Sequence, residues 1–436
     1  MRGGSAVLLA LGLMVTTAAG AQSSQPDDEI AASANSSAVT PIAGSQRYYP
    51  APGQPFQLSS PADPSTSTLT KAEGDLRVAT LHAELTGDGS SERPIQQLIA
   101  SLSGGQHAQA RAIAQTAQIN DPDVLVLTGV TYDDDGQIPE LLRTQYLASG
   151  QRGESAIDYP YVYAAPTNSG LESGADLDGD GTIGGAGDAI GYGEFAGQHS
   201  TVVFSKHPIL TDQVRTFQNF LWRDLPENSL PESRFSDLEQ SIIRLYQSSL
   251  WDIPVQVDED RAPVHIIGSA IPLPEDPTGI DLVRADDQRR VLAEYAAGNA
   301  WYLTDDDGAH GGLPAGHPFV VAGQHSAPQP LAAESEDLDI LLENAALQDP
   351  RPRAVTEQPL TGRSGTPWHT DHTATRAVPG ERDVRASYVL PSAALGVSQS
   401  GVFWPAEGEY GYEVVDPQSR FGLQNRLVWV DLQDLG

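Results

Sequence analysis

The stretch DVLVLTGV, Asp123 to Val130, has the composition of a buried β-strand, because its apolar run is short and rich in valine. Another strand-like run precedes it at residues 76–81. Between the two runs, the segment 106–119, HAQARAIAQTAQIN, has apolar residues at helical spacing. The order strand, helix, strand predicts that the fold begins with a β-α-β unit.

Strand-like segments outnumber helical ones in the rest of the chain, and the two kinds are interspersed. The expected strands are residues 161–165, 200–205, 254–257, 264–269, 319–322, 386–390, 401–404 and 426–431. The expected helices are residues 236–247 and 286–297. This mixture predicts a layered α/β domain built on mixed sheets.

The N-terminus has the pattern of an export signal. Arg2 is followed by an apolar run at residues 6–15 and by the small residues Ala19-Gly20-Ala21, so we expect a signal peptide at residues 1–21 and a mature chain that begins at Gln22. An uncleaved anchor is the alternative. No later segment is long and apolar enough to span a membrane. The expected location is therefore the periplasm or the extracellular medium.

Composition sets the expected domain boundaries. Residues 22–73 are rich in Ser, Pro, Ala, Asp and Thr and predict a disordered linker. Residues 74–436 form the expected folded domain, within which residues 349–382 lack periodicity and predict a long surface loop.

The chain is strongly acidic. It carries 25 Lys and Arg against 58 Asp and Glu, a formal net charge of -33, and contains no cysteine. Nucleic-acid binding requires clustered cations that neutralise phosphates, so we do not expect a nucleic-acid partner. Without disulfides, an exported domain must be stabilised by its core or by bound ions.

The stretch ADLDGDGTIGGAGD, residues 175–188, resembles a calcium-binding loop. Asp176, Asp178 and Asp180 alternate, and a glycine follows where such a loop turns sharply. The twelfth position holds a glycine in place of the usual glutamate, and Asp188 stands one residue further on as a substitute. The loop predicts a structural calcium site, with a solvated Asp-Gly turn as the alternative. The runs Asp133–Gly136 and Asp305–Gly308 are expected to be solvated turns.

Longer stretches carry a family resemblance. In chain order they are LRVATLH, DPDVLVLTGVTYDDDG, IDYPYVYAAPTNSG, DLDGDGTIGGAGDAIGYG, RTFQNFLWRDLP, WDIPV, GGLPAGHPFVVAG, YVLPS, GVFWPA and NRLVWVD. Together, from Leu76 to Asp431, they resemble exported bacterial members of the endonuclease/exonuclease/phosphatase superfamily. The resemblance implies a four-layer α/β sandwich, DNase I-like, in which two mixed sheets pack face to face with helices outside. The active members of this family hydrolyse phosphate esters with a divalent metal.

The resemblance fails at the residues that perform this chemistry. The family has an asparagine after its first strand, a metal-binding glutamate after its second and a phosphate-binding histidine after a later one. It also has a G-D-x-N motif, a further aspartate and a final S-D-H motif. This chain has at these positions His82, Gly129, Ala270, Gln324, Ser326, Ser387, Gln424 and Asn425.

These replacements predict a loss of metal-dependent hydrolysis. Mg²⁺ requires carboxylate oxygens, whereas glycine and neutral amides bind it poorly, and the amide of Asn425 cannot accept a proton as a general base. We therefore expect no catalytic Mg²⁺ and a binding or structural role, with a ligand or protein partner that the sequence does not identify. The alternative is an active metal-dependent phosphoesterase or nuclease that uses other residues.

Three histidines allow a second interpretation of the site. His82, His199 and His325 lie at or beside positions of the family's site, so they form either a transition-metal set or three separate side chains. No tight spacing motif links them. His369 and His372, in the expected surface loop, are interpreted as surface polarity rather than as metal ligands.

Overall fold

The computed structural model describes residues 63–272, 280–326, 338–356, 360–361, 367–369, 373–376, 384–416, 419, 422–433 and 435. The expected signal peptide and most of the expected linker lie outside the described residues. So does much of the expected loop at 349–382, including His372 and the side chain of His369.

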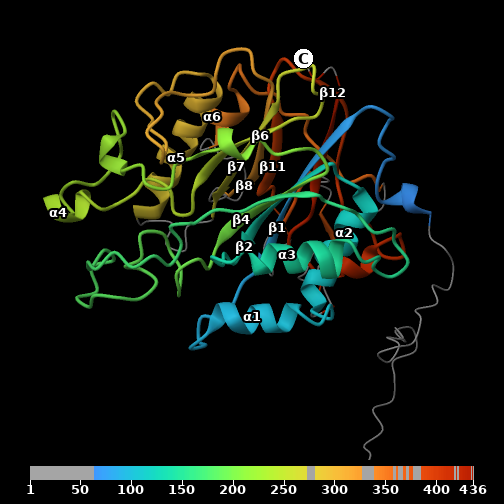
Figure 1. Cartoon of the computed structure of the whole chain (residues 1–436), viewed down its shortest axis with the longest axis horizontal. Helices are drawn as coiled ribbons and strands as arrows, with labels where there is room; N and C mark the ends of the chain where they lie inside the picture. The colour runs from blue at the N-terminus through green and yellow to red at the C-terminus, as the bar shows by residue number, and fades with distance from the viewer. Residues whose placement is uncertain are drawn as a thin grey trace, which may run out of the picture. The chain divides into compact units, whose positions relative to one another are not determined.

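A six-stranded mixed sheet forms one of the two central layers (Figure 1). Its order is β12-β13-β1-β2-β4-β3. Its strands are β1 (Leu76–Leu85), β2 (Val124–Val130), β3 (Tyr161–Tyr163), β4 (Ser200–Ser205), β12 (Gly396–Val402) and β13 (Val428–Gln433). β1 and β2 are parallel, as the β-α-β pattern predicts, and all other neighbours are antiparallel.

A five-stranded mixed sheet forms the other central layer, in the order β11-β8-β7-β6-β5. Its strands are β5 (Arg215–Thr216), β6 (Leu250–Val255), β7 (Val264–Ile271), β8 (Phe319–His325) and β11 (Ser387–Pro391). Only β7 and β8 are parallel among its described pairs. A separate pair, β9 (Leu360–Thr361) and β10 (Pro367–His369), lies within the expected loop.

Helices cover the outer faces of the two sheets. Figure 1 shows α1, α2 and α3 beside the first sheet and α5 and α6 beside the second. The helices are α1 (Pro94–Leu102), α2 (Ala108–Asn120), α3 (Gln137–Leu141), α4 (Asp237–Gln240), α5 (Ile280–Ala296) and α6 (Asp339–Leu342). A π-helical turn, η2 (Leu142–Leu147), continues α3. The described residues also form the short 3-10 turns η1 (Pro64–Thr66), η3 (Thr211–Gln213), η4 (Trp222–Asp224) and η6 (Tyr412–Val414). The predicted four-layer architecture is confirmed.

The strand alternation of β8 shows how the core is divided. Val320 and Ala322 pack into the cluster that includes β1, β2 and β13 of the first sheet. Phe319 and Val321 pack into a second cluster with residues of α5, such as Leu292. Even-numbered residues of β8 therefore face the first sheet, whereas odd-numbered ones face α5.

Two expectations need correction. The predicted helix at 236–247 is limited to α4, which Ser236 and Glu239 begin with a capping box before the chain turns away. Residues 63–73 pack against the domain although they were expected in the linker. The Thr68 hydroxyl lies 2.8 Å from Asn120 Oδ1, and Lys71 Nζ lies 2.5 Å from Asp123 Oδ1.

A buried ion pair joins the first and last strands of the domain. Arg77 on β1 contacts Asp431 on β13 through Nε–Oδ1 and Nη2–Oδ2 distances of 2.6 and 2.7 Å. The guanidinium also stacks on the Trp429 ring, 3.9 Å from its centre. This two-point pairing gives both buried charges a partner, which a dry interior requires.

Candidate active site

The C-terminal end of β1 places His82 between the sheets. Arg77 donates to the carbonyl of Asn120 in α2, so odd-numbered side chains of β1 face the helices and even-numbered ones face the second sheet. His82 Nδ1 lies 3.0 Å from the hydroxyl of Thr128 on β2. Burial, followed by the charges of Arg376 and His199, lowers the pKa of His82 to about 3. Its imidazole is therefore neutral at physiological pH.

The His82 ring fills the space beside Gly129. A Cβ atom on Gly129 would lie 2.5 Å from Cε1 and 2.9 Å from Nδ1 of His82, well inside van der Waals contact. Gly129 also has a φ of +70°, which L-residues rarely adopt. The position where the family carries its metal-binding glutamate therefore takes a side chain only if the His82 ring moves away.

The second sheet contributes neutral polar groups to the same region. Gln324 on β8 is paired directly with Ser387 on β11 and with Ala270 on β7. Gln324 faces the first sheet, since it follows Val320 and Ala322 in the strand alternation. The buried hydroxyls of Ser326 and Ser387 have no hydrogen-bond partner. The described residues at this edge of the sheet supply amide and hydroxyl groups but no carboxylate.

The C-terminal position of the site is taken by Asn425. Its amide nitrogen donates to Glu84 Oε1 over 3.1 Å, while its buried Oδ1 has no partner. The neighbouring Gln424 is half-buried. Glu84 was not identified from the sequence as a site residue. It lies two residues after His82, which places it on the same face of a regular strand. Its positive φ, 48°, belongs to a register irregularity of β1 that the sequence does not reveal.

His325 lies on the other face of its sheet. Its ring centre is 6.1 Å from that of Tyr388, and burial, assisted by the charge of Arg289 on α5, lowers its pKa to about 3. Both ring nitrogens are buried without a partner. The hypothesis that His325 joins His82 and His199 at one metal is therefore wrong, because a β-sheet separates it from His82.

The acidic loop at 175–188 brings three of its four candidate carboxylates together. Among the described residues, Asp176, Asp178 and Asp188 are the only group of three acidic or histidine side chains whose ligand atoms lie within 4.8 Å of one another. Asp188 is buried and accepts from the backbone of Leu177 at 2.6 Å. Asp180 stands outside this group and accepts from the backbone of Thr182 at 2.7 Å.

The two other aspartate runs differ from the expectation of solvated turns. Asp133 is buried and accepts from the backbone of Gln137 and Ile138 at the start of α3. Asp305 is buried and forms an ion pair with Arg215 at 2.6 Å. In each run the first aspartate stabilises the fold, and the next two are exposed.

A family model for the endonuclease/exonuclease/phosphatase family matches residues 101–323, just over half of the 436 residues. The chain belongs to the endonuclease/exonuclease/phosphatase family. No curated protein sequence matches this family member. Within its described residues, no helix combines the length and the apolar character that crossing a bilayer requires.

Solved structures of similar proteins include two of this family by name. One is an endonuclease/exonuclease/phosphatase from Beutenbergia cavernae DSM 12333, at 18% identity over 82% of this chain and 71% of that chain, with a TM-score of 0.45. Another is a family protein from Leptotrichia buccalis C-1013-b, at 10% identity over 82% and 99%, with a TM-score of 0.42. Sphingomyelinase C from Streptomyces griseocarneus has 15% identity over 82% and 99%, with a TM-score of 0.41.

The divalent metal that the family uses does not fit the residues of this member. His82 occupies the space beside Gly129, and Gln324 offers an amide where a hard cation requires carboxylate oxygen. Glu84 brings a carboxylate to the site, and Asn425 already donates to it. A single hydrogen-bonded carboxylate does not supply the oxygen set that Mg²⁺ requires.

Proposed function

We propose that this family member has lost metal-dependent phosphoester hydrolysis and acts as an exported binding or structural module. The observation that carries the proposal is the His82 ring in the space beside Gly129. A missing ligand leaves a gap that water or another group can fill, whereas a filled gap excludes the ligand.

The remaining groups are poorly suited to acid–base chemistry. A general base works best when its pKa lies near the operating pH, and His82 has a pKa of about 3. Burial also lowers the pKa of His199. Asn425 and Gln424, at the positions of the family's base and its orienting aspartate, carry amides that do not titrate.

One observation favours the alternative, an active enzyme with non-standard residues. Glu84 places a carboxylate within 3.1 Å of Asn425 Nδ2, inside the region where the family performs its chemistry. If this carboxylate recruited a metal together with the unpartnered oxygen of Asn425, hydrolysis would depend on both residues.

The deciding experiment is a hydrolysis assay. The purified protein is incubated with Mg²⁺, Mn²⁺, Ca²⁺ or Zn²⁺ and with a phosphomonoester, a phosphodiester or DNA. We expect turnover no faster than in the buffer. Metal-dependent turnover that persists through purification would overturn the proposal, and its fall in Glu84→Gln or Asn425→Ala would assign it to these residues.

A restoration series tests the reason for the loss. Gly129→Glu alone should give no activity, because the His82 ring blocks the new carboxylate. His82→Asn with Gly129→Glu opens the space, and addition of Ala270→His, Gln324→Asp, Ser326→Asn, Ser387→Asp, Gln424→Asp and Asn425→His rebuilds the family's set. Hydrolysis gained by Gly129→Glu alone would contradict the proposed blockage.

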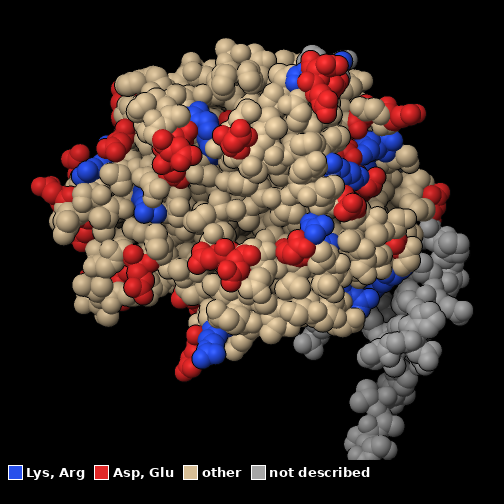
Figure 2. Space-filling view, viewed as in Figure 1, with Lys and Arg blue, Asp and Glu red and all other residues tan. Residues whose placement is uncertain are grey.

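The proposed location and partners rest on sequence and charge. On the face shown in Figure 2, acidic and basic side chains occur in small separate groups and no extended basic patch is present. The net charge of -33 disfavours a nucleic-acid partner. Mass spectrometry of the exported protein should give Gln22 as its first residue; a chain that retains residues 1–21 would contradict cleavage.

A further inference from the structure

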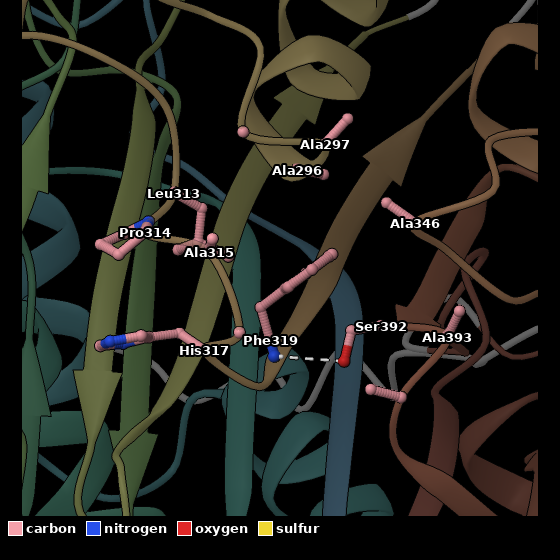
Figure 3. A pocket seen from close by; sticks show the side chains of 13 residues that line it. Ala296, Ala297, Leu313, Pro314, Ala315, His317, Phe319, Ala346, Ser392 and Ala393 are labelled. Carbon is pink, nitrogen blue, oxygen red and sulfur yellow. Dashed lines mark hydrogen bonds between the residues drawn. The ribbon is translucent and has the colours of Figure 1, made fainter.

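A cavity of about 430 Å³ lies near the N-terminal end of β8, at the opposite end of that strand from the candidate active site. Small apolar side chains from the end of α5 and from three loops line most of it (Figure 3). In Figure 3 the His317 side chain extends away from Phe319 and Ser392, so its ring does not point across the cavity. The polar ring of His317 therefore lies on the side of the loop away from the cavity, where it contacts β7.

Parallel pairing of β7 and β8 brings two distant histidines together. His265 is in register with Phe319, and its backbone N–H donates to the carbonyl of Pro318 over 2.9 Å. His317 directly precedes Pro318. Its Nδ1 atom lies 3.0 Å from Nε2 of His265. His265 is buried, whereas His317 is half-buried and reaches solvent.

A buried carboxylate fixes the protonation of the inner ring. His265 Nδ1 lies 2.6 Å from Asp252 Oδ1, and the hydroxyl of Tyr295 donates to Oδ2 of the same carboxylate over 2.5 Å. A carboxylate accepts, so Nδ1 of His265 carries a proton. In the neutral ring, Nε2 then has a free lone pair that points at His317.

We propose that His265 Nε2 and His317 Nδ1 form a binding site for one divalent transition-metal cation, with Asp252 as a positioning residue. A carboxylate that holds the outer N–H of a histidine is the usual support of a metal-binding imidazole. In this arrangement the cation replaces the proton shared by the two nitrogens, and the displaced proton moves to Nε2 of His317 or to solvent.

The separation of the two nitrogens suits such a cation. With metal–nitrogen bonds of about 2.0–2.1 Å, a separation of 3.0 Å corresponds to an angle of roughly 95° at the metal, provided that the rings turn so that both lone pairs meet beside the line between the two nitrogens. Adjacent positions in octahedral or tetragonal coordination have nearly this angle, which Ni²⁺ and Cu²⁺ favour, and a small opening of the pair suits Zn²⁺. Water supplies the remaining ligands from the solvent side of His317.

The nearby charges permit a cation. Arg215 approaches the Tyr295 hydroxyl at 3.3 Å, and Asp305 pairs with this guanidinium at 2.6 Å. The charge of Arg215 is therefore balanced, which leaves the Asp252 carboxylate to favour a cation at His265. Nitrogen ligands select transition metals over Mg²⁺ and Ca²⁺, so this site is chemically distinct from the acidic loop.

The test is calorimetric titration of the full chain with NiCl₂ or ZnCl₂, in the presence of Ca²⁺ to occupy the acidic loop. We expect one equimolar site in the wild-type protein and at least a roughly tenfold loss of affinity in His317→Gln. The glutamine retains a hydrogen-bonding group near His265 but ligates weakly. His310→Gln, an exposed histidine in the same segment, is the matched control and should bind as the wild type does.

Two further measurements identify the ligands. Electron paramagnetic resonance with Cu²⁺ should show coupling to two nitrogens in the wild type and to fewer in His317→Gln. Affinity should fall in acid, because protons compete for the same nitrogens. The site would be disproved by absent saturable binding, by equal affinity in His317→Gln, or by binding that Asp178→Asn removes. None of these outcomes bears on hydrolysis, so the inference stands or falls separately from the proposed function.

Discussion

At the scale of single residues, His82 and Gly129 restrict each other's replacement. In its present position the ring leaves no space for a Cβ at residue 129, and the glycine gives the ring its place beside Thr128. The place of the His82 ring therefore depends on a residue without a side chain at 129. This dependence links the departures of the two positions from the family's pattern.

Gly129→Ala tests this dependence, and Gly136→Ala is its matched control. Both glycines have a positive φ, 70° and 64°, but a Cβ on Gly136 would meet nothing within 4 Å. Both variants carry the backbone cost, so the additional destabilisation of Gly129→Ala, about 1–3 kcal/mol, measures the clash with His82. Urea unfolding should show this difference, and His82→Ala should reduce it. Equal unfolding free energies for the two alanine variants would contradict the clash.

At the scale of elements, the acidic loop is held by its own backbone. Asp176 accepts from Gly179 and Gly181, and Asp188 accepts from Leu177 and Gly184. These bonds fix the chain while three carboxylates remain close to one another, an arrangement that repulsion disfavours. We propose that a structural calcium ion relieves this repulsion.

Calcium should therefore raise the melting temperature of the full chain, and chelator should lower it. Asp178→Asn is expected to remove most of this response, because Asp178 belongs to the group of three carboxylates. Asp180→Asn should retain more of it, since Asp180 lies outside the group. Differential scanning calorimetry with and without Ca²⁺ measures the effect. A melting temperature that is the same with Ca²⁺ and with chelator would show that the loop binds no structural calcium ion.

At the scale of the whole molecule, the layers were predictable and several contacts were not. Short valine-rich runs predicted the strands, because strand periodicity is local, and the family resemblance implied that the strands form two facing sheets. The side of the sheet on which His325 lies could also have been predicted from the sequence. Residues 324 and 326 align with the family's site residues, so residue 325 between them lies on the opposite face of the strand. The contact between His265 and His317 could not be predicted, because it depends on the register of strands that are distant in sequence.

Burial of neutral histidines should make the domain sensitive to acid. The pKa values of His82 and His325 are lowered from 6.5 to about 3, so between these values the unfolded chain binds more protons than the folded one. Both histidines contribute fully to stability above pH 6.5, where they are neutral in the folded and unfolded chain alike. As the pH falls from 6.5 towards 3, the free energy of unfolding decreases by up to about 1 kcal/mol per pH unit for each histidine.

His325→Leu tests this dependence, because both nitrogens of His325 lack partners and an apolar replacement leaves no group unpaired. We expect a smaller loss of unfolding free energy between pH 7 and pH 5 than in the wild type, measured by urea titration. The exposed His310, changed to Leu, should leave the pH dependence unaltered. The same slope in all three proteins would show that His325 is not held neutral by the fold.

The Arg77–Asp431 pair has a consequence for biogenesis. Its partners come from strands made at the start and near the finish of domain synthesis, and each would be a buried, uncompensated charge alone. The domain therefore cannot complete its fold while its last strand is still in the ribosome. If the chain is exported as proposed, it stays open, and so transportable, until this strand emerges.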